Sequence, residues 1–292
     1  MQPAATQDQD AAYLLEIKLE TADGRLKGRL AVPKAPMRLA ELAFNALPVV
    51  EQIVAQATRR EQQVECRAIS CRKGCGACCR QLVPLSPPEA WMLADLLDGQ
   101  PASRRAGLEL RFRAVVGRLD AAGLIEELLS TPPTDDAARS RGGRYFLMGE
   151  ACPFLEDESC SIHPYRPSAC REYLVTSPAS LCANPTSSSV RRVNVSVRAS
   201  EALARLTAEL LGGEPQLIPL TLAPDWAREH ADDGLRAWDG KFLITRLLDL
   251  MSGKQSASQG DQGGLLAGQT VDAAEPQDQV DGVNPDDRPV AD

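Results

Sequence analysis

The residues of this chain best suited to chemistry are two groups of cysteines. Four thiols fall within nine residues, in the stretch Cys71-Arg-Lys-Gly-Cys75-Gly-Ala-Cys78-Cys79. A second group follows at wider spacing, so that eight of the nine cysteines lie in two sets of four; its members are Cys152, Cys160, Cys170 and Cys182. Thiolate sulfur is a ligand for zinc and iron, and a short loop brings two sulfurs to one centre at small entropic cost. The spacing therefore predicts a metal-thiolate site.

The two groups differ in how a site could form. Gly74 and Gly76 flank Cys75 and permit the sharp turns that a compact metal loop requires. Cys78 and Cys79 are adjacent, so their side chains diverge, and we expect them to serve different metals or one of them to be a spare thiol. The second group has seven, nine and eleven residues between its cysteines. Tertiary structure must therefore complete that group.

The thiols leave the identity of the metal open. Four thiolates suit tetrahedral Zn²⁺ and equally suit [2Fe–2S] or [4Fe–4S] clusters. Each such site would carry a charge of about −2, which calls for compensation nearby. Basic residues within the motifs could donate hydrogen bonds to sulfur, or could be ordinary surface residues; they are Arg72, Lys73, Arg80, Arg166 and Arg171.

The order of the motifs resembles a known family. The downstream group reads Cys152-Pro-Phe-Leu, then Cys160-Ser-Ile, then Arg166-Pro-Ser-Ala-Cys170-Arg, and it follows Cys75-Gly-Ala-Cys78-Cys79. This pattern is similar to the YkgJ or CxxCxxCC cysteine-cluster family, described as a zinc- or iron-chelating domain. The resemblance spans about residues 71–182 and implies metal chelation rather than a particular reaction. His163 departs from the pattern, because an aromatic residue often follows Cys-x-Ile in the family.

Three functions compete at this point. The first is a metal-nucleated binding module, whose domain should unfold when the metal is chelated. The second is an iron–sulfur redox or catalytic protein, such as an electron carrier or an enzyme like the flagellin lysine methylases, in which a related cysteine pattern occurs. The third uses Cys75 and Cys78 as a redox pair, but that motif normally follows a strand in a βαβ pattern, which the sequence lacks. Cys66 is expected to be a partly buried free thiol, and His163 at most an opportunistic ligand.

Composition narrows the class of protein. The 292 residues contain 43% hydrophobic and 25% charged residues and no long apolar run, so we expect no membrane association. The net charge of −8 is concentrated in residues 252–292, which carry −6, and no basic cluster suggests nucleic-acid binding. The first residues do not resemble a secretory signal, which favours the cytoplasm and disfavours disulfides. A protein partner is compatible with the sequence but is not identified by it.

The remaining segments are expected to position the cysteines. Alternating apolar residues predict a β-hairpin within residues 1–36. Helical spacing predicts helix over residues 38–65, with Pro48 as a kink or as the boundary between two helices, within a lead-in segment 37–70. The cysteine domain is expected at 71–183. Inside it, Ser86 and Glu89 form a capping box for a helix through Leu97, and further helices are expected at 103–119 and 121–129, with a connecting loop across 131–144.

The C-terminal third is expected to be helical and then disordered. A polar connector at 184–189 precedes a predicted helix over 200–211, which Gly212 and Gly213 should end. One or two helices are expected over 226–251, with Trp238 and Phe242 on an apolar face. Residues 252–292 are predicted to be a disordered acidic tail, which leaves 184–251 as the helical C-terminal region. The fold predicted is mainly α, with helices around an irregular, metal-nucleated cysteine cluster.

Overall fold

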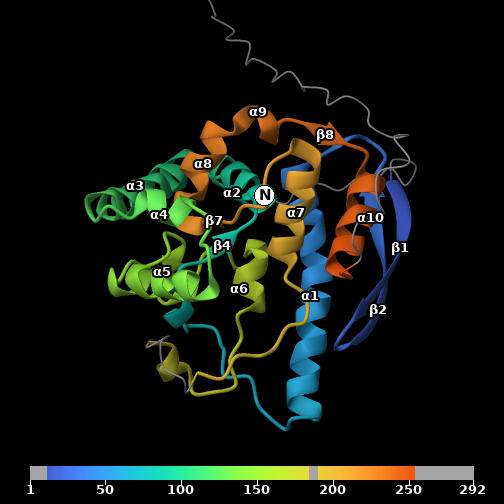
Figure 1. Cartoon of the computed structure of the whole chain (residues 1–292), viewed down its shortest axis with the longest axis horizontal. Coiled ribbons are helices and arrows are strands. Elements are labelled where there is room, and N and C mark those ends of the chain that lie inside the picture. The colour runs from blue at the N-terminus through green and yellow to red at the C-terminus, as the bar shows by residue number, and fades with distance from the viewer. Residues whose placement is uncertain (1–11, 184–189, 254–292) are drawn as a thin grey trace, which may run out of the picture.

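The computed structural model describes residues 12–183 and 190–253, and Figure 1 shows their arrangement. Helices dominate, as predicted. The described residues form ten α-helices, and their strands pair as two-stranded antiparallel sheets. The predicted connector at 184–189 and the predicted disordered tail from residue 254 onward lie outside the described residues.

The predicted N-terminal hairpin is present. β1 (Ala12–Thr21) pairs antiparallel with β2 (Gly24–Pro33). Its inward-facing apolar residues are buried, and they are Ile17, Leu19, Leu26 and Val32. The hairpin packs against α1 (Leu39–Gln63) and α10 (Gly240–Met251), and Figure 1 shows it beside these two helices. This contact supplies the support that an isolated hairpin lacks in water.

Of the two alternatives predicted for Pro48, the boundary between two helices is wrong. α1 continues through Pro48 as a single helix. A proline inside a helix removes a hydrogen bond and costs about 3 kcal/mol. Apolar residues on both sides of Pro48 are buried in the main hydrophobic core, and they are Leu39, Leu42, Ala46, Val49, Val50, Ile53 and Ala57. Burial of this continuous face offsets the cost of the proline.

Two further helices complete the main core. α2 (Pro87–Asp98) and α7 (Ala199–Leu211) pack with each other and with α1. The predicted capping box at the start of α2 is confirmed, because the Ser86 N–H donates to Glu89 Oε2 at 3.0 Å and the Ser86 hydroxyl accepts from the Glu89 N–H at 3.4 Å. α7 ends at Gly212, as predicted.

Helices between the two cysteine groups form a second, smaller core. α3 (Ala102–Ala121) matches its prediction, and α4 (Ile125–Leu129) is shorter than expected. Buried apolar residues of these helices pack with Tyr145 and Leu222. The second half of α3 and the helix that follows it therefore share this smaller core, whereas Leu108 and Phe112 of α3 belong to the main core.

The connecting loop predicted across 131–144 is wrong, because most of it belongs to α5 (Asp135–Leu147). The Thr134 hydroxyl caps this helix by accepting a hydrogen bond from the Ala137 N–H at 3.1 Å. Two acidic residues in the first turn favour the same helix end. The Arg141-Gly-Gly-Arg sequence suggested a loop, but packing of Tyr145 into the second core holds it in a helix.

The C-terminal region contains more helices than expected. α8 (Ala223–Glu229) and α9 (Ala231–Gly234) precede α10. Trp238 is not on a helix but is buried in β8 (Ala237–Trp238), which pairs with β3 (Met37–Arg38).

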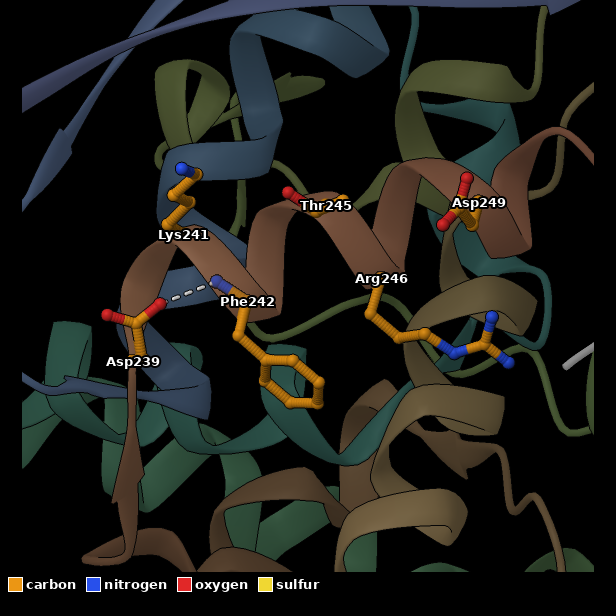
Figure 2. Close-up of a pocket in the computed structure, with 6 residues that line it drawn as sticks. All are labelled: Asp239, Lys241, Phe242, Thr245, Arg246 and Asp249. Carbon is orange, nitrogen blue, oxygen red and sulfur yellow. Dashed lines mark hydrogen bonds between the residues drawn. The ribbon is translucent and has the colours of Figure 1, made fainter. Parts of the chain in front are cut away.

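The predicted apolar face of α10 is also partly wrong, because Phe242 is exposed. Its ring lines a shallow pocket of about 370 Å³ beside Arg246, and its N–H donates to the side chain of the N-cap residue Asp239 (Figure 2). No cysteine lines this pocket. Phe242 therefore takes no part in the core.

The cysteines lie in segments with little regular structure. In Figure 1 these are the teal and yellow loops at the lower end of the molecule, below α5 and α6. Their short elements are η2 (Ala77–Arg80), β5 (Leu155–Glu156), β6 (Ser159–Cys160), η3 (His163–Tyr165), α6 (Ser168–Glu172) and η4 (Ala179–Ala183). The remaining short elements are β4 (Pro84–Leu85), β7 (Ile218–Pro219) and η5 (Leu220–Leu222).

Candidate metal centre

The first cysteine group is a compact loop that ends in a single 3₁₀ turn. Gly74 has a φ of 82°, the left-handed conformation that glycine adopts without strain. The N–H of Cys75 donates to the carbonyl of Arg72 at 3.2 Å, and the N–H of Cys79 donates to the carbonyl of Gly76 at 3.0 Å. The loop therefore folds back on itself, as the glycines predicted.

Two cysteines of the second group occupy similar small turns. The N–H of Phe154 hydrogen-bonds the sulfur of Cys152, and the N–H of Ile162 hydrogen-bonds that of Cys160. Burial raises the pKa of Cys152 to about 12, although the Phe154 N–H opposes the shift. The Cys-Pro-Phe and Cys-Ser-Ile sequences thus each aim a backbone donor at the preceding sulfur.

The two groups meet directly. The N–H of Cys152 donates to the carbonyl of Cys79 at 2.7 Å. In the turn between β5 and β6, Glu158 forms an ion pair with Arg80 of η2. A Cβ atom added to Gly76 would lie 2.6 Å from Glu158 Oε2, so a larger residue at this position would displace the Glu158 carboxylate. The structure therefore joins two motifs that are far apart in the sequence.

Cys78 lies at the centre of the combined group. Burial raises the pKa of five other thiols, and a coulombic interaction with Cys78 raises each of them further: Cys71, Cys152, Cys160, Cys170 and Cys182. A hydrogen bond with Cys79 raises the pKa of Cys78 itself, so the prediction that these two side chains diverge is wrong. Coulombic interactions weaken with distance, so thiols from both motifs lie in the neighbourhood of Cys78.

Cys182 is placed differently from what sequence order suggests. It is buried on η4, and η4 packs against η2, which carries Cys78 and Cys79. Burial raises the pKa of Cys182, and coulombic interactions with Cys71, Cys78 and Cys75 raise it further. All three of these thiols come from the first group. Cys182 thus belongs to the second group in the sequence but lies beside the first group in space. The spacing of the cysteines did not predict this position.

A family model covers this part of the chain. Residues 70–189 match the family CxxCxxCC, whose description is "Putative zinc- or iron-chelating domain". The match confirms the resemblance carried by the motifs and supports metal binding by this segment. No curated protein matches the chain, and no solved structure does.

The thiols within residues 70–189 lie in the same region of the fold but do not form a coordination sphere. Within residues 12–183 and 190–253, no three His, Cys, Asp or Glu side chains form a group that could hold a metal ion as they stand. All nine cysteines are free thiols. Metal binding by this domain would therefore require the sulfurs to move closer together than they are in this structure.

Arg166 is the arginine most closely associated with the thiols. Burial raises the pKa of Cys71, Cys160 and Cys170, and the positive charge of Arg166 opposes the shift in all three. Its Nε atom is buried and has no hydrogen-bond partner in the described part of the chain. A buried donor of this kind could bind a thiolate sulfur.

Two more of the arginines predicted near the sulfurs, Arg171 and Arg80, contact oxygen atoms. Arg171 is buried, donates to the carbonyls of Arg166 (2.7 Å) and Pro164, and pairs with Glu51 of α1. It therefore holds the loop that carries Arg166. Arg80 donates to Glu158 and, at 3.0 Å, to the carbonyl of Gly76. A role for either residue in hydrogen-bonding sulfur stays a prediction.

Cys66 and His163 both lie outside the thiol group. Cys66 is exposed rather than partly buried, and follows the end of α1 with a φ of 51°. His163 is exposed on η3, and its pKa is lowered by burial and by Arg166 and Arg171, with no cysteine among the causes. This position agrees with the expectation that His163 is at most an opportunistic metal ligand.

Glu89 has a role that the sequence did not reveal. Besides its capping box, its side chain accepts a hydrogen bond from the Ser168 N–H at 2.7 Å and from the Ser200 hydroxyl at 2.8 Å. Glu89 is fully buried. It therefore fixes the start of α6, which carries Cys170, to α2 and α7. The capping-box signal identified Glu89, but its partners are remote in sequence.

One further observation concerns the helices as a whole. In the part of the chain that the structure describes, none is both long enough and apolar enough to cross a lipid bilayer.

Proposed function

We propose that the CxxCxxCC domain chelates zinc or iron through its eight clustered cysteines. The observation that carries this proposal is the convergence of the two motifs, through the hydrogen bond between Cys152 and Cys79 and the arrangement of thiols around Cys78. Eight thiols gathered from two separate motifs have no purpose in an ordinary hydrophobic core. Metal chelation accounts for both their number and their proximity.

The residues present suit such a metal. Sulfur is a preferred ligand of Zn²⁺ and of iron–sulfur clusters. The ligands would be Cys71, Cys75, Cys78, Cys79, Cys152, Cys160, Cys170 and Cys182. When bound, the metal would supply a positive centre that ionises these thiols and ties the two motifs together. The unpaired Nε of Arg166 is placed to compensate part of the negative charge of the thiolates.

The chain's own residues orient the sulfurs. The N–H groups of Phe154 and Ile162 bind the sulfurs of Cys152 and Cys160, which favours the thiolate form at these two positions. The left-handed Gly74 turns the chain between Cys71 and Cys75. Glu89 and Arg171 hold the segments that carry Cys170 and Arg166.

An iron–sulfur redox or catalytic protein is the second candidate. The observation that favours it is the surplus of thiols, since one tetrahedral Zn²⁺ needs only four. The dithiol oxidoreductase is disfavoured, because strands of the described residues pair only as antiparallel two-stranded sheets and offer no βαβ unit.

The test is metal and sulfide analysis of the full chain isolated without oxygen. Zinc, iron and acid-labile sulfide are measured per chain, in the wild type and in Cys66→Ala as the matched thiol control. We expect bound metal in both proteins. Labile sulfide together with iron would select the iron–sulfur candidate, and zinc without sulfide would select simple chelation. A reduced, folded protein that holds neither metal would contradict the proposal.

A reducing, cytoplasmic location suits this function, because dense free thiols persist where disulfides are reduced. We infer this location from the cysteine content. Trapping the thiols with an alkylating reagent, a chelator and a denaturant at the moment of cell lysis should label all of them, and disulfide-linked chains at that moment would contradict the inference.

A further inference from the structure

The N-terminal hairpin has a long strand edge without a partner in the described part of the chain. β1 and β2 form a sheet of their own, and no other described strand pairs with either of them. α1 packs against β2, where Gln52 lies close to Gly28. β1 lies at the outer border of the molecule (Figure 1). The edge of β1 is therefore open to a further strand.

The register shows which backbone groups of β1 point outward. Thr21 and Gly24 flank a two-residue turn and are partners in the ladder. Residues that flank such a turn form a hydrogen-bonded pair, and antiparallel pairs then alternate between hydrogen-bonded and non-hydrogen-bonded. Pro33, which has no N–H to donate, lies opposite Ala12 at a non-hydrogen-bonded position and agrees with this assignment. The residues of β1 whose N–H and C=O groups point away from β2 are therefore Ala12, Leu14, Glu16, Lys18 and Glu20.

The side chains along this edge alternate in charge on one face and are apolar on the other. Glu16, Lys18 and Glu20 share the outer face, and the side chains of Lys18 and Glu16 are 68% and 63% exposed. On the inner face, Ile17 and Leu19 are buried in the main core. A strand edge with unpaired N–H and C=O groups is a template for another strand. The charge pattern decides which strand fits.

β1 is complementary to a second copy of itself. When two β1 strands pair antiparallel about a two-fold axis at Ile17, Glu16 of each copy lies opposite Lys18 of the other. Both residues have outward-pointing backbone groups, so each such pair exchanges two backbone hydrogen bonds in addition to the contact between opposite charges. On the inner face, Leu15 of each copy lies opposite Leu19 of the other. Backbone, charge and apolar pattern therefore agree in a single register.

Other self-pairings fit less well. An axis at Lys18 would place Lys18 against itself and Glu16 against Glu20, and like charges directly opposite are destabilising. An axis at Leu19 would align only residues 17–21. The outward-pointing charged residues of β2 are all basic, and they are Arg25, Lys27 and Arg29. Two copies of the β2 edge would therefore repel each other.

We propose that this protein forms a homodimer in which the β1 strands of two copies pair antiparallel about a two-fold axis at Ile17. The two hairpins then form one four-stranded sheet with the strand order β2, β1, β1, β2. The Glu16–Lys18 contacts, which occur twice, fix the register. Leu14, which is 63% exposed in the single chain, lies opposite Glu20 of the second copy and is partly covered. The dimer does not depend on metal binding.

A charge reversal at Lys18 tests the interface. The full chain is kept reduced, so that disulfides do not link chains, and its oligomeric state is measured by analytical ultracentrifugation. We expect the wild type to be a dimer. Lys18→Glu makes both charge contacts repulsive and should raise the dissociation constant of the dimer by about tenfold or more. Lys18 lies opposite Lys27 within its own hairpin, so this substitution does not weaken the hairpin itself.

Lys27→Glu is the matched control. It changes the net charge by the same amount and lies on the same face of the hairpin, but on the strand away from the interface. It should remain a dimer. A wild type that is monomeric, whether the β1 edge is free or covered by another segment of the chain, overturns the proposal. A dimer that persists in Lys18→Glu as it does in Lys27→Glu overturns it too, because another surface then joins the chains.

A mixture of two variants tests the register. Glu16→Lys alone should be monomeric, because it places a lysine opposite Lys18 of the second copy. Mixed in equal amounts with Lys18→Glu, it should form a heterodimer, since each acidic side chain then faces a lysine. Circular dichroism identical to that of the wild type shows that both variants are folded. Two folded variants that stay monomeric when mixed would overturn the proposed pairing.

Discussion

The carboxylate of Glu158 binds both terminal nitrogens of Arg80, at 3.0 Å and 2.6 Å. Glu158 lies in the tight turn between β5 and β6, where both it and Asp157 have positive φ values, of 56° and 47°. Such conformations are unfavourable for residues other than glycine. The strained turn is thus held in place by an ion pair that connects the second cysteine motif to the first.

Replacing Glu158 with glutamine should weaken metal binding more than it weakens the fold. The ion pair is largely exposed, and such pairs contribute at most about 1 kcal/mol to stability. Loss of a residue that orients the ligand loops typically lowers metal affinity by about 10-fold or more. Competition titration with a zinc chelator measures the change. Glu156→Gln is the matched control, because Glu156 lies in the same hairpin but pairs with Arg104 and Arg111 of α3. Equal affinities in the two variants would contradict the account.

Glu89→Gln should destabilise the whole protein. The carboxylate is fully buried and accepts hydrogen bonds from Ser86, Ser168 and Ser200. An amide cannot accept all of them, so the free energy of unfolding should fall by at least about 2 kcal/mol. Urea unfolding measures it. Glu41→Gln is the comparison, since Glu41 accepts from the Arg38 N–H in an exposed capping box and its loss should cost about 1 kcal/mol or less. A similar fall in the free energy of unfolding in both variants would show that the buried hydrogen bonds of Glu89 contribute no more to stability than an exposed capping box does.

Tyr145 should make stability depend on alkaline pH. Burial raises the pKa of Tyr145 from 10 to about 12. The neutral phenol is favoured in the folded state, so its contribution is complete below pH 10 and is lost as the pH rises through 12. Between these values the wild type should lose about 2–3 kcal/mol more than Tyr145→Phe. The difference is measured as the free energy of unfolding of both proteins as a function of pH. Both are kept reduced and metal-free, so that ionisation of the cysteines contributes equally to the two pH profiles. Parallel pH profiles would indicate an unshifted tyrosine.

Removing the metal should loosen the cysteine segments and leave most helices folded. Unfolding of the entire domain was the expectation from sequence, but α1, α2, α7 and α10 share a core of apolar side chains. Hydrogen exchange of the chelated protein should therefore become faster over residues 64–83 and 150–183. Protection in the four helices should persist. Loss of protection throughout would show that the metal nucleates the fold.

The sequence predicted those features that depend on local chemistry. The hairpin, the capping box of Ser86 and Glu89, the end of α7 at Gly212 and the turn at Gly74 all follow from residue types and spacing. Two features failed because tertiary packing overrode local signals: Pro48 inside α1, and the glycines of α5, which Tyr145 anchors. The placement of Cys182 beside the first motif could not be predicted, because it depends on how the chain returns past Val175.

The central claim is that thiols from both motifs bind metal together. The most direct measurement is the metal content per chain of Cys75→Ala, Cys170→Ala and Cys66→Ala, isolated side by side without oxygen. The account predicts that Cys75→Ala and Cys170→Ala each lose metal to a similar extent, and that Cys66→Ala retains the wild-type amount. Full metal content in Cys170→Ala, with loss confined to Cys75→Ala, would contradict it.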